Sequence, residues 1–122
     1  MTNNTVKNLS RAEKITLMIL GIDSEPIKGK VWFQKELFLV SKLDEKLSDQ
    51  LNFKPHHYGP HSYEAQYVLE NLEAEGFIET FNDEILITDE GDEVYHDLKK
   101  EFSKDQIEFY KYVKDFYWLF GR

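Results

Sequence analysis

Residues 76–91, GFIETFNDEILITDEG, contain the pattern that decides the fold. Gly76 is placed to end a helix in the left-handed conformation, which glycine adopts without steric cost. Two short apolar segments, near 77–81 and 84–88, flank an Asn-Asp turn and predict a β-hairpin. Thr88 or Asp89 is then in position to cap another helix. The stretch therefore predicts a helix, a hairpin and a second helix in direct succession.

Helical patterns account for most of the remaining chain. Two capping boxes, Ser10–Glu13 and Ser103–Gln106, each mark a helix start, because the two side chains satisfy early backbone N–H groups. Two prolines and a glycine exclude a long helix from residues 52–62. The helices are expected at about 10–22, from Gly29 through Leu51 with a break allowed, at 62–75, after Thr88 or Asp89, and from 103 onward.

This order of elements favours an α+β fold, a winged helix-turn-helix with a short β-hairpin wing and an added aromatic C-terminal helix. A two-stranded hairpin is not stable alone, so it must fold back onto the helices, as a wing does. We expect a flexible N-terminus over residues 1–9, a winged-helix domain over 10–102 and the C-terminal helix over 103–122.

Composition narrows the class of protein. A chain of 122 residues is long enough for one core. It has no apolar run of the roughly 20 residues that cross a bilayer and no signal-peptide pattern, so a cytoplasmic location without membrane contact is expected. The absence of cysteine excludes disulfides, iron–sulfur clusters and cysteine nucleophiles. Without a phosphate-binding glycine loop, a nucleophile motif or paired aspartates, we expect no enzyme and no cofactor.

Two parts of the sequence carry a family resemblance. ILITDEGDEVYHDL is similar to the strand, Leu-Thr-x-x-Gly and helix passage of many bacterial and archaeal winged-helix regulators. PIKGKVWFQKELFLVSK with HHYGPHSYEAQYVLENLEAEGFIE resembles the small YwgA-like proteins and, more distantly, the Panacea-type antitoxin domains, over about residues 10–98. The matching positions are Lys28, Gly29, Lys30, Phe33, Gln34, Lys35, Leu37, Phe38, Leu39, Tyr58, Gly59, Pro60 and Ser62. The resemblance implies a winged-helix fold and a regulatory or interaction role without a defined catalytic site.

Charge is unevenly divided in this chain, whose net charge is −8. Residues 1–61 contain nine Lys or Arg against seven Asp or Glu, whereas residues 62–122 contain six against sixteen. The helix before the hairpin exposes Glu64, Glu70, Glu73 and Glu75, and the wing adds Glu79, Asp83 and Glu84. DNA affinity depends on neutralising phosphates, so this half of the chain argues against the usual winged-helix function.

A cluster of donors in the first half is the candidate binding site. One interpretation joins the 54–61 turn to nearby lysines as a nucleic-acid or other anion site, since lysine and histidine donate well to phosphate. Metal binding by His56 and His61 is disfavoured without cysteine or a nearby carboxylate, and a purely structural Tyr58-Gly59-Pro60 turn remains open. The expected nucleic-acid-binding residues are Lys28, Lys30, Lys35, Lys54, His56, His57 and His61, with Gln66 and Asn71 as the base readers.

The C-terminal helix holds seven of the chain's eighteen aromatic residues. A helix with aromatic side chains around more than half of its circumference must be buried on more than one side. Either the first two helices enclose it, or a second copy or another partner shares it. We favour a homodimer that uses Phe109, Tyr110, Val113, Phe116, Tyr117 and Phe120.

Two functional hypotheses follow. The first, narrowly favoured, is a dimeric DNA-binding transcriptional regulator that turns its basic edges to DNA and its acidic half away. The second is a protein-interaction module, antitoxin-like or an adaptor, that docks its partner on the acidic helix and wing.

Overall fold

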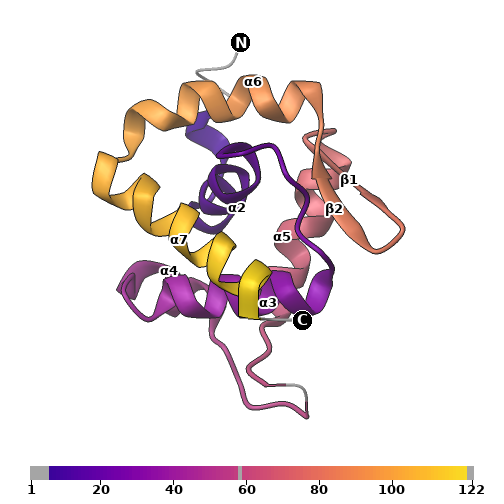
Figure 1. Cartoon of the computed structure of the whole chain (residues 1–122), viewed down its shortest axis with the longest axis vertical. Coiled ribbons are helices and arrows are strands. Elements are labelled where there is room, and N and C mark those ends of the chain that lie inside the picture. The colour runs from indigo at the N-terminus through magenta and orange to yellow at the C-terminus, as the bar shows by residue number, and fades with distance from the viewer. Residues whose placement is uncertain (1–5, 58, 121–122) are drawn as a thin grey trace.

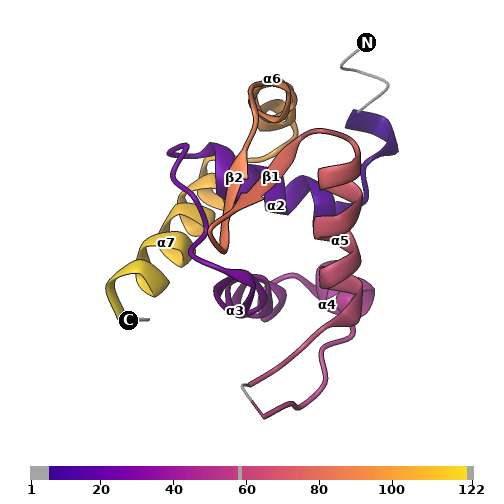
Figure 2. The ribbon, with the colours of Figure 1, turned by 90° about the vertical axis from the view of Figure 1, so that its right-hand side faces the viewer.

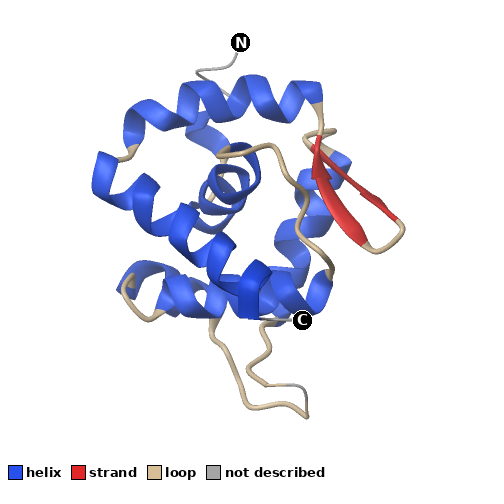
Figure 3. Ribbon diagram, in the orientation of Figure 1, coloured by secondary structure: helices blue, strands red, loops and turns tan. Residues whose placement is uncertain are grey.

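The structure, a computed structural model, describes residues 6–57 and 59–120, while the side chains of residues 117–120 fall outside that description. It is an α+β fold. The helices pack against one another, and a two-stranded antiparallel hairpin lies at one side of them (Figures 1 and 3). The elements are α2 (Arg11–Gly21), α3 (Lys30–Ser41), α4 (Glu45–Leu51), α5 (Tyr63–Ala74), β1 (Ile78–Phe81), β2 (Glu84–Ile87), α6 (Asp89–Leu98), the 3-10 turn η1 (Lys99–Glu101) and α7 (Lys104–Phe120).

The predicted helix starts are confirmed. The Ser10 hydroxyl accepts from the Glu13 N–H at 3.2 Å, and the Ser10 N–H donates to Glu13 Oε1 at 2.7 Å. Ser103 and Gln106 make the same reciprocal pair at the start of α7, at 2.8 and 3.1 Å. Thr88 caps α6 by accepting from the Gly91 N–H at 3.0 Å. These caps satisfy N–H groups that have no partner inside the helix.

The end of α5 is a glycine cap, as the sequence predicts. Gly76 has a φ of 82°. The Phe77 N–H donates to the Leu72 carbonyl and the Gly76 N–H to the Glu73 carbonyl, both at 3.0 Å, which is a Schellman motif. The chain therefore leaves α5 in a fixed direction and enters β1 after three connecting residues, 75–77.

The hairpin forms at the predicted position and gains one unexpected partner. Ile78 faces Ile87 and Phe81 faces Glu84, and the turn residues Asn82 and Asp83 have φ values of 51° and 66°, as a type I′ turn requires. Ile27, in the segment between α2 and α3, pairs with Ile85 through two hydrogen bonds of 2.9 Å. A one-residue third strand thus fixes the hairpin to the chain that leads into α3.

The core forms around α2, which lies at the centre with α5, α6, α7 and α4 around it (Figure 1). Close packing of α2 on α6 depends on Gly21, because a Cβ there would lie 2.3 Å from the Tyr95 ring. Val6 is also buried in this core, although it falls within the segment 1–9 that the sequence predicts to be flexible. Residues 1–5 lie outside the described residues.

The C-terminal helix α7 packs against α2 and α3. Tyr110 and Val113 are 2% and 0% exposed. This corrects their expected place on an open dimer surface, because the first two helices already enclose them. Within the described residues, no helix is long and apolar enough to cross a membrane.

Candidate functional site

A pair of hydrogen bonds joins α3 to the start of α5. The side-chain amide of Gln34 donates to the Ser62 carbonyl and accepts from the Ser62 N–H, both at 2.9 Å. The Ser62 hydroxyl caps α5 by accepting from the Ala65 N–H at 2.9 Å and donates to the Leu51 carbonyl at 2.5 Å. Ser62 and Gln34 are both buried. The Phe33-Gln34-Lys35 and Gly59-Pro60-His61-Ser62 segments, which carry the family resemblance, therefore meet in space.

The segment between α4 and α5 projects from the body of the protein below α3 (Figure 2). Lys54 and His61 pair through two backbone hydrogen bonds of 2.8 Å, which hold the two arms of this segment together. The His56 and His61 rings lie 5.3 Å apart, and the His61 ring meets the Tyr63 ring edge-on at 4.9 Å. Three rings from the turn and from the first residue of α5 thus contact in sequence.

A cleft of about 210 Å³ lies between α3, the start of α5 and this projecting segment. Its polar lining is Lys30, Gln34, Lys35, His56, His61 and Gln66. Its apolar lining is Val31, Phe33, Pro60 and Leu69, and Gly59 completes it. The cleft brings several of the expected donors together from α3, α5 and the projecting segment.

Five of the nine residues expected to bind nucleic acid line this cleft, and four do not. Lys30, Lys35, His56, His61 and Gln66 come together in it. Lys28, Lys54, His57 and Asn71 are absent from its lining. The Lys28 ammonium instead pairs with Glu84 of the hairpin at 2.8 Å, which neutralises it in part.

The outer surface of α5 and the hairpin is acidic and aromatic. Tyr63, Tyr67 and Phe81 are 61%, 60% and 67% exposed. We use the name acidic–aromatic face for the exposed acids and rings of these two elements, which are Tyr63, Glu64, Tyr67, Glu70 and Glu73 of α5 with Glu79, Phe81 and Asp83 of the hairpin. The two elements lie side by side, with β1 packed against α5 (Figure 2).

Sequence reasoning identified the acids of this face but missed its aromatic residues. Tyr63 and Tyr67 are four residues apart and lie off the apolar stripe formed by Ala65, Leu69 and Leu72. That spacing places both rings on the solvent side of the helix and could have been read from the sequence. On the same helix Gln66 donates to Glu70 at 3.4 Å, so one expected base reader already contacts a carboxylate.

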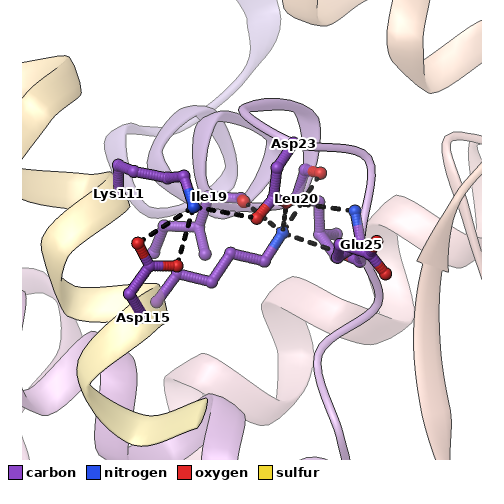
Figure 4. Close-up of polar contacts among 7 residues, drawn as sticks. Ile19, Leu20, Asp23, Glu25, Lys111 and Asp115 are labelled. Atoms are coloured by element: carbon purple, nitrogen blue, oxygen red, sulfur yellow. Dashed lines mark hydrogen bonds and ion pairs between the residues drawn. The ribbon is translucent and has the colours of Figure 1, made fainter. Parts of the chain in front are cut away.

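A buried lysine, Lys114, occupies a second polar region. Figure 4 shows this region, with Asp23, Glu25 and Lys111 labelled. Its Nζ donates to the Ile19 carbonyl at 2.8 Å, to the Glu25 carbonyl at 2.7 Å and to Asp23 Oδ1 at 2.5 Å. The last turn of α2 has no basic residue of its own. Lys114 therefore supplies, from α7, the positive charge that the C-terminal end of a helix favours.

The charges around Lys114 shift each other's pKa. Burial lowers the pKa of Lys114, although its hydrogen bond to Asp23 opposes that change. Burial also acts to raise the pKa of Asp23, but hydrogen bonds from Lys114 and from the Glu25 N–H outweigh it and hold that pKa below its ordinary value. Asp23 thus stays ionised beside the ammonium.

Glu36 of α3 is the second buried charge-bearing group near Lys114. It is 4% exposed, and its Oε1 makes no hydrogen bond to a described residue. Burial raises the pKa of Glu36 to about 8, against the attraction of Lys114, so the carboxyl is mainly protonated at neutral pH. The only sign of this buried carboxyl in the sequence was an acidic residue among the apolar residues of α3.

The dimerisation residues are divided by the packing of α7. Phe109 is half-buried against the core, and Phe116 is 36% exposed. Tyr112, which the expected set omits, is 61% exposed, and its ring lies 6.2 Å from that of Phe116. The side chains of Tyr117 and Phe120 lie outside the described residues.

Comparisons with known proteins add no relative. A scan against protein-family models, a search of curated proteins and a search of solved structures each find no match. Among the described residues, no three histidine, aspartate or glutamate side chains are grouped so that they could hold a metal ion. Function is therefore inferred from the cleft, the acidic–aromatic face and the exposed part of α7.

Proposed function

We propose that this protein is a non-enzymatic regulator with a winged-helix fold that docks another protein on its acidic–aromatic face. The order of elements supports the fold proposal: a helix, the one-residue strand at Ile27, further helices, and a hairpin that directly follows α5. In that fold α5 takes the place of the recognition helix and the hairpin that of the wing. The resemblance to YwgA-like proteins and Panacea-type domains favours the same class.

The observation that carries the docking proposal is the combination of exposed rings and acids on two elements in contact, α5 and the hairpin. Tyr63, Tyr67 and Phe81 are each at least 60% exposed. Exposed aromatic side chains are typical of the centre of a protein interface, where they account for much of the binding free energy. The surrounding glutamates would repel a phosphate backbone but attract a basic protein surface. We therefore infer a partner with a basic, partly apolar docking segment.

Affinity capture with matched variants tests this proposal. Tagged wild-type protein is compared with the Tyr67→Ser/Phe81→Ser double variant and with Leu43→Ser, which changes a 79% exposed apolar residue outside the face. One protein should be retained by the wild type and by Leu43→Ser after nuclease treatment, and lost from the double variant. Equal retention by all three, or retention that nuclease abolishes, would contradict protein docking.

DNA binding as a transcriptional regulator is the second candidate, and the cleft favours it. Lys30 and Lys35 line the same cleft as Gln66 of α5, so cationic groups and a possible base reader are adjacent. Binding should then weaken steeply with salt, and Lys30→Glu with Lys35→Glu should abolish it. A flat response to salt in a fluorescence-anisotropy titration would rule out this candidate.

A homodimer through α7 remains a proposal, now centred on Tyr112 and Phe116. Both side chains are exposed, and an aromatic pair on a terminal helix suits an isologous contact with a second copy. Analytical ultracentrifugation at micromolar concentration should give a dimer for the wild type and a monomer for Tyr112→Ser/Phe116→Ser. A monomeric wild type would remove the dimer from the proposal.

A further inference from the structure

We propose that the cleft between α3, α5 and the projecting segment binds a small organic anion, with its apolar body inside and its carboxylate at the lysines. This site shares no residue with the acidic–aromatic face, although His61 contacts Tyr63 and Gln66 contacts Glu70 of that face. The inference does not depend on protein docking there. It would give the protein a ligand whose presence changes the charge beside α5.

The charge of the cleft lining is the first support. Lys30, Lys35, His56 and His61 line it, and no acidic side chain is among the described lining residues, although the chain carries a net charge of −8. The Lys35 ammonium lies 4.6 Å from the centre of the Trp32 ring, which holds it near this end of α3. Gln66 contacts an acid outside the lining through its 3.4 Å bond to Glu70. A ligand that meets this lining should therefore be negative.

The start of α3 adds to this positive character. Lys30 and Val31, its first two residues, line the cleft, and the N-cap is Gly29, which makes no side-chain cap. The first N–H groups of α3 are thus not satisfied by a capping side chain, in contrast to those of α2, α4, α5 and α6. Such groups attract an anion. This feature strengthens the charge already supplied by the two lysines.

The apolar part of the lining defines the body of the ligand. Phe33, Leu69, Pro60 and Val31 provide a surface that inorganic ions do not need and that an aromatic or branched group would cover. His61, which also lines the cleft, has a buried Nδ1 that makes no hydrogen bond to a described residue. At about 210 Å³ the cleft is smaller than the roughly 300–1,000 Å³ of sites for drug-sized ligands. A compact acid of benzoate size fits these limits better than a nucleotide.

A titration followed by NMR tests the inference with three probes: benzoate, its neutral analogue benzamide, and inorganic phosphate. Benzoate should give saturable shifts of the Gln66 side-chain amide and of backbone amides at the start of α3. Benzamide, which keeps the shape without the charge, and phosphate, which keeps the charge without the apolar body, should each bind at least about tenfold more weakly.

Matched variants locate the charge. Lys30→Gln with Lys35→Gln should weaken benzoate binding by about tenfold or more, while Lys104→Gln, an exposed lysine at the start of α7, should leave it unchanged. Equal binding of benzoate and benzamide, equal binding of phosphate, or shifts that do not saturate would each overturn the proposal. Because the three-probe comparison uses the wild type, it stands even if the double variant fails to fold.

Discussion

Two lysines, Lys114 in the interior and Lys30 at the cleft, use their positive charge differently. Lys114 is 5% exposed, and its ammonium donates to two carbonyls and to Asp23 at 2.8 Å or less, so its three protons are all used inside the fold. Lys30 lies at the cleft, is exposed, and pairs with no acid among the described residues. In one acidic chain, positive charge therefore stabilises the packing of α7 in one region and remains accessible to a ligand in the other.

The largest effect is expected from Lys114→Met, which keeps most of the side-chain volume but removes the ammonium. The carbonyls at the end of α2 and the Asp23 carboxylate would lose their shared donor, at a cost of about 3 kcal/mol of unfolding free energy. Urea denaturation measures this change.

Lys111→Met is the matched control for that measurement. Lys111 lies one turn earlier on α7 and pairs with Asp115 and Asp23, but its side chain is 43% exposed. An exposed pair contributes at most about 1 kcal/mol. If the two variants lost equal stability, burial would not be what distinguishes Lys114.

A pH-dependent effect is expected at Glu36, the buried neighbour of Lys114. Its pKa rises from 4.5 to about 8 on folding, so between these values the native state holds a proton that the unfolded state has released. The free energy of unfolding then falls as pH rises through this window, by at most about 1.4 kcal/mol per pH unit. The loss is absent below the unfolded pKa and complete above the folded one.

Glu36→Gln should remove this pH-dependent contribution to the free energy of unfolding. Between pH 5.5 and 7.5 the wild type should lose on the order of 2 kcal/mol more than the variant, as measured by urea denaturation at each pH. Taking the difference between the two proteins cancels the histidines, which titrate in the same range. Parallel pH profiles would mean that Glu36 is not protonated in the folded state.

The smallest effect on stability is expected at the cleft. Lys30→Gln changes an exposed side chain without an ion pair among the described residues, so the free energy of unfolding should shift by less than about 0.5 kcal/mol. Thermal denaturation measures it. A loss approaching that of Lys114→Met would show that Lys30 serves the fold and would end the contrast between the two regions.

Local signals explain which parts of the fold the sequence predicts. The capping boxes at Ser10 and Ser103, the Gly76 cap and the hairpin register depend on residues a few positions apart, so they can be read directly. The Gln34–Ser62 pair links residues 28 positions apart, and the Lys114 bonds link residues 89 or more positions apart, so no local pattern specifies them. The strand-like pairing of Ile27 is likewise recognised only in the structure, where Ile85 lies beside it.

The candidate sites follow the same division. The donors of the cleft were predicted by residue type, yet only packing separates Lys30 and Lys35, which line it, from Lys28, which pairs with the hairpin. The spacing of Tyr110 and Val113 along the helix is the same whether they face a partner or the core. Their burial, with α7 packed against α2 and α3, shows that they face the core. Periodicity defines which residues share a helix face, but not what covers that face.

The base of the hairpin has a kinetic consequence. A Cβ at Gly91 would lie 2.1 Å from the Phe77 carbonyl oxygen, and the Thr88 N–H donates to that carbonyl at 3.0 Å. The start of α6 is therefore packed directly against the residue that precedes β1. With Ile27 paired on the other strand, the hairpin is held along one edge and at its base before any partner arrives. A partner would thus meet a preformed surface, and its association rate should depend on diffusion and ionic strength rather than on a folding step.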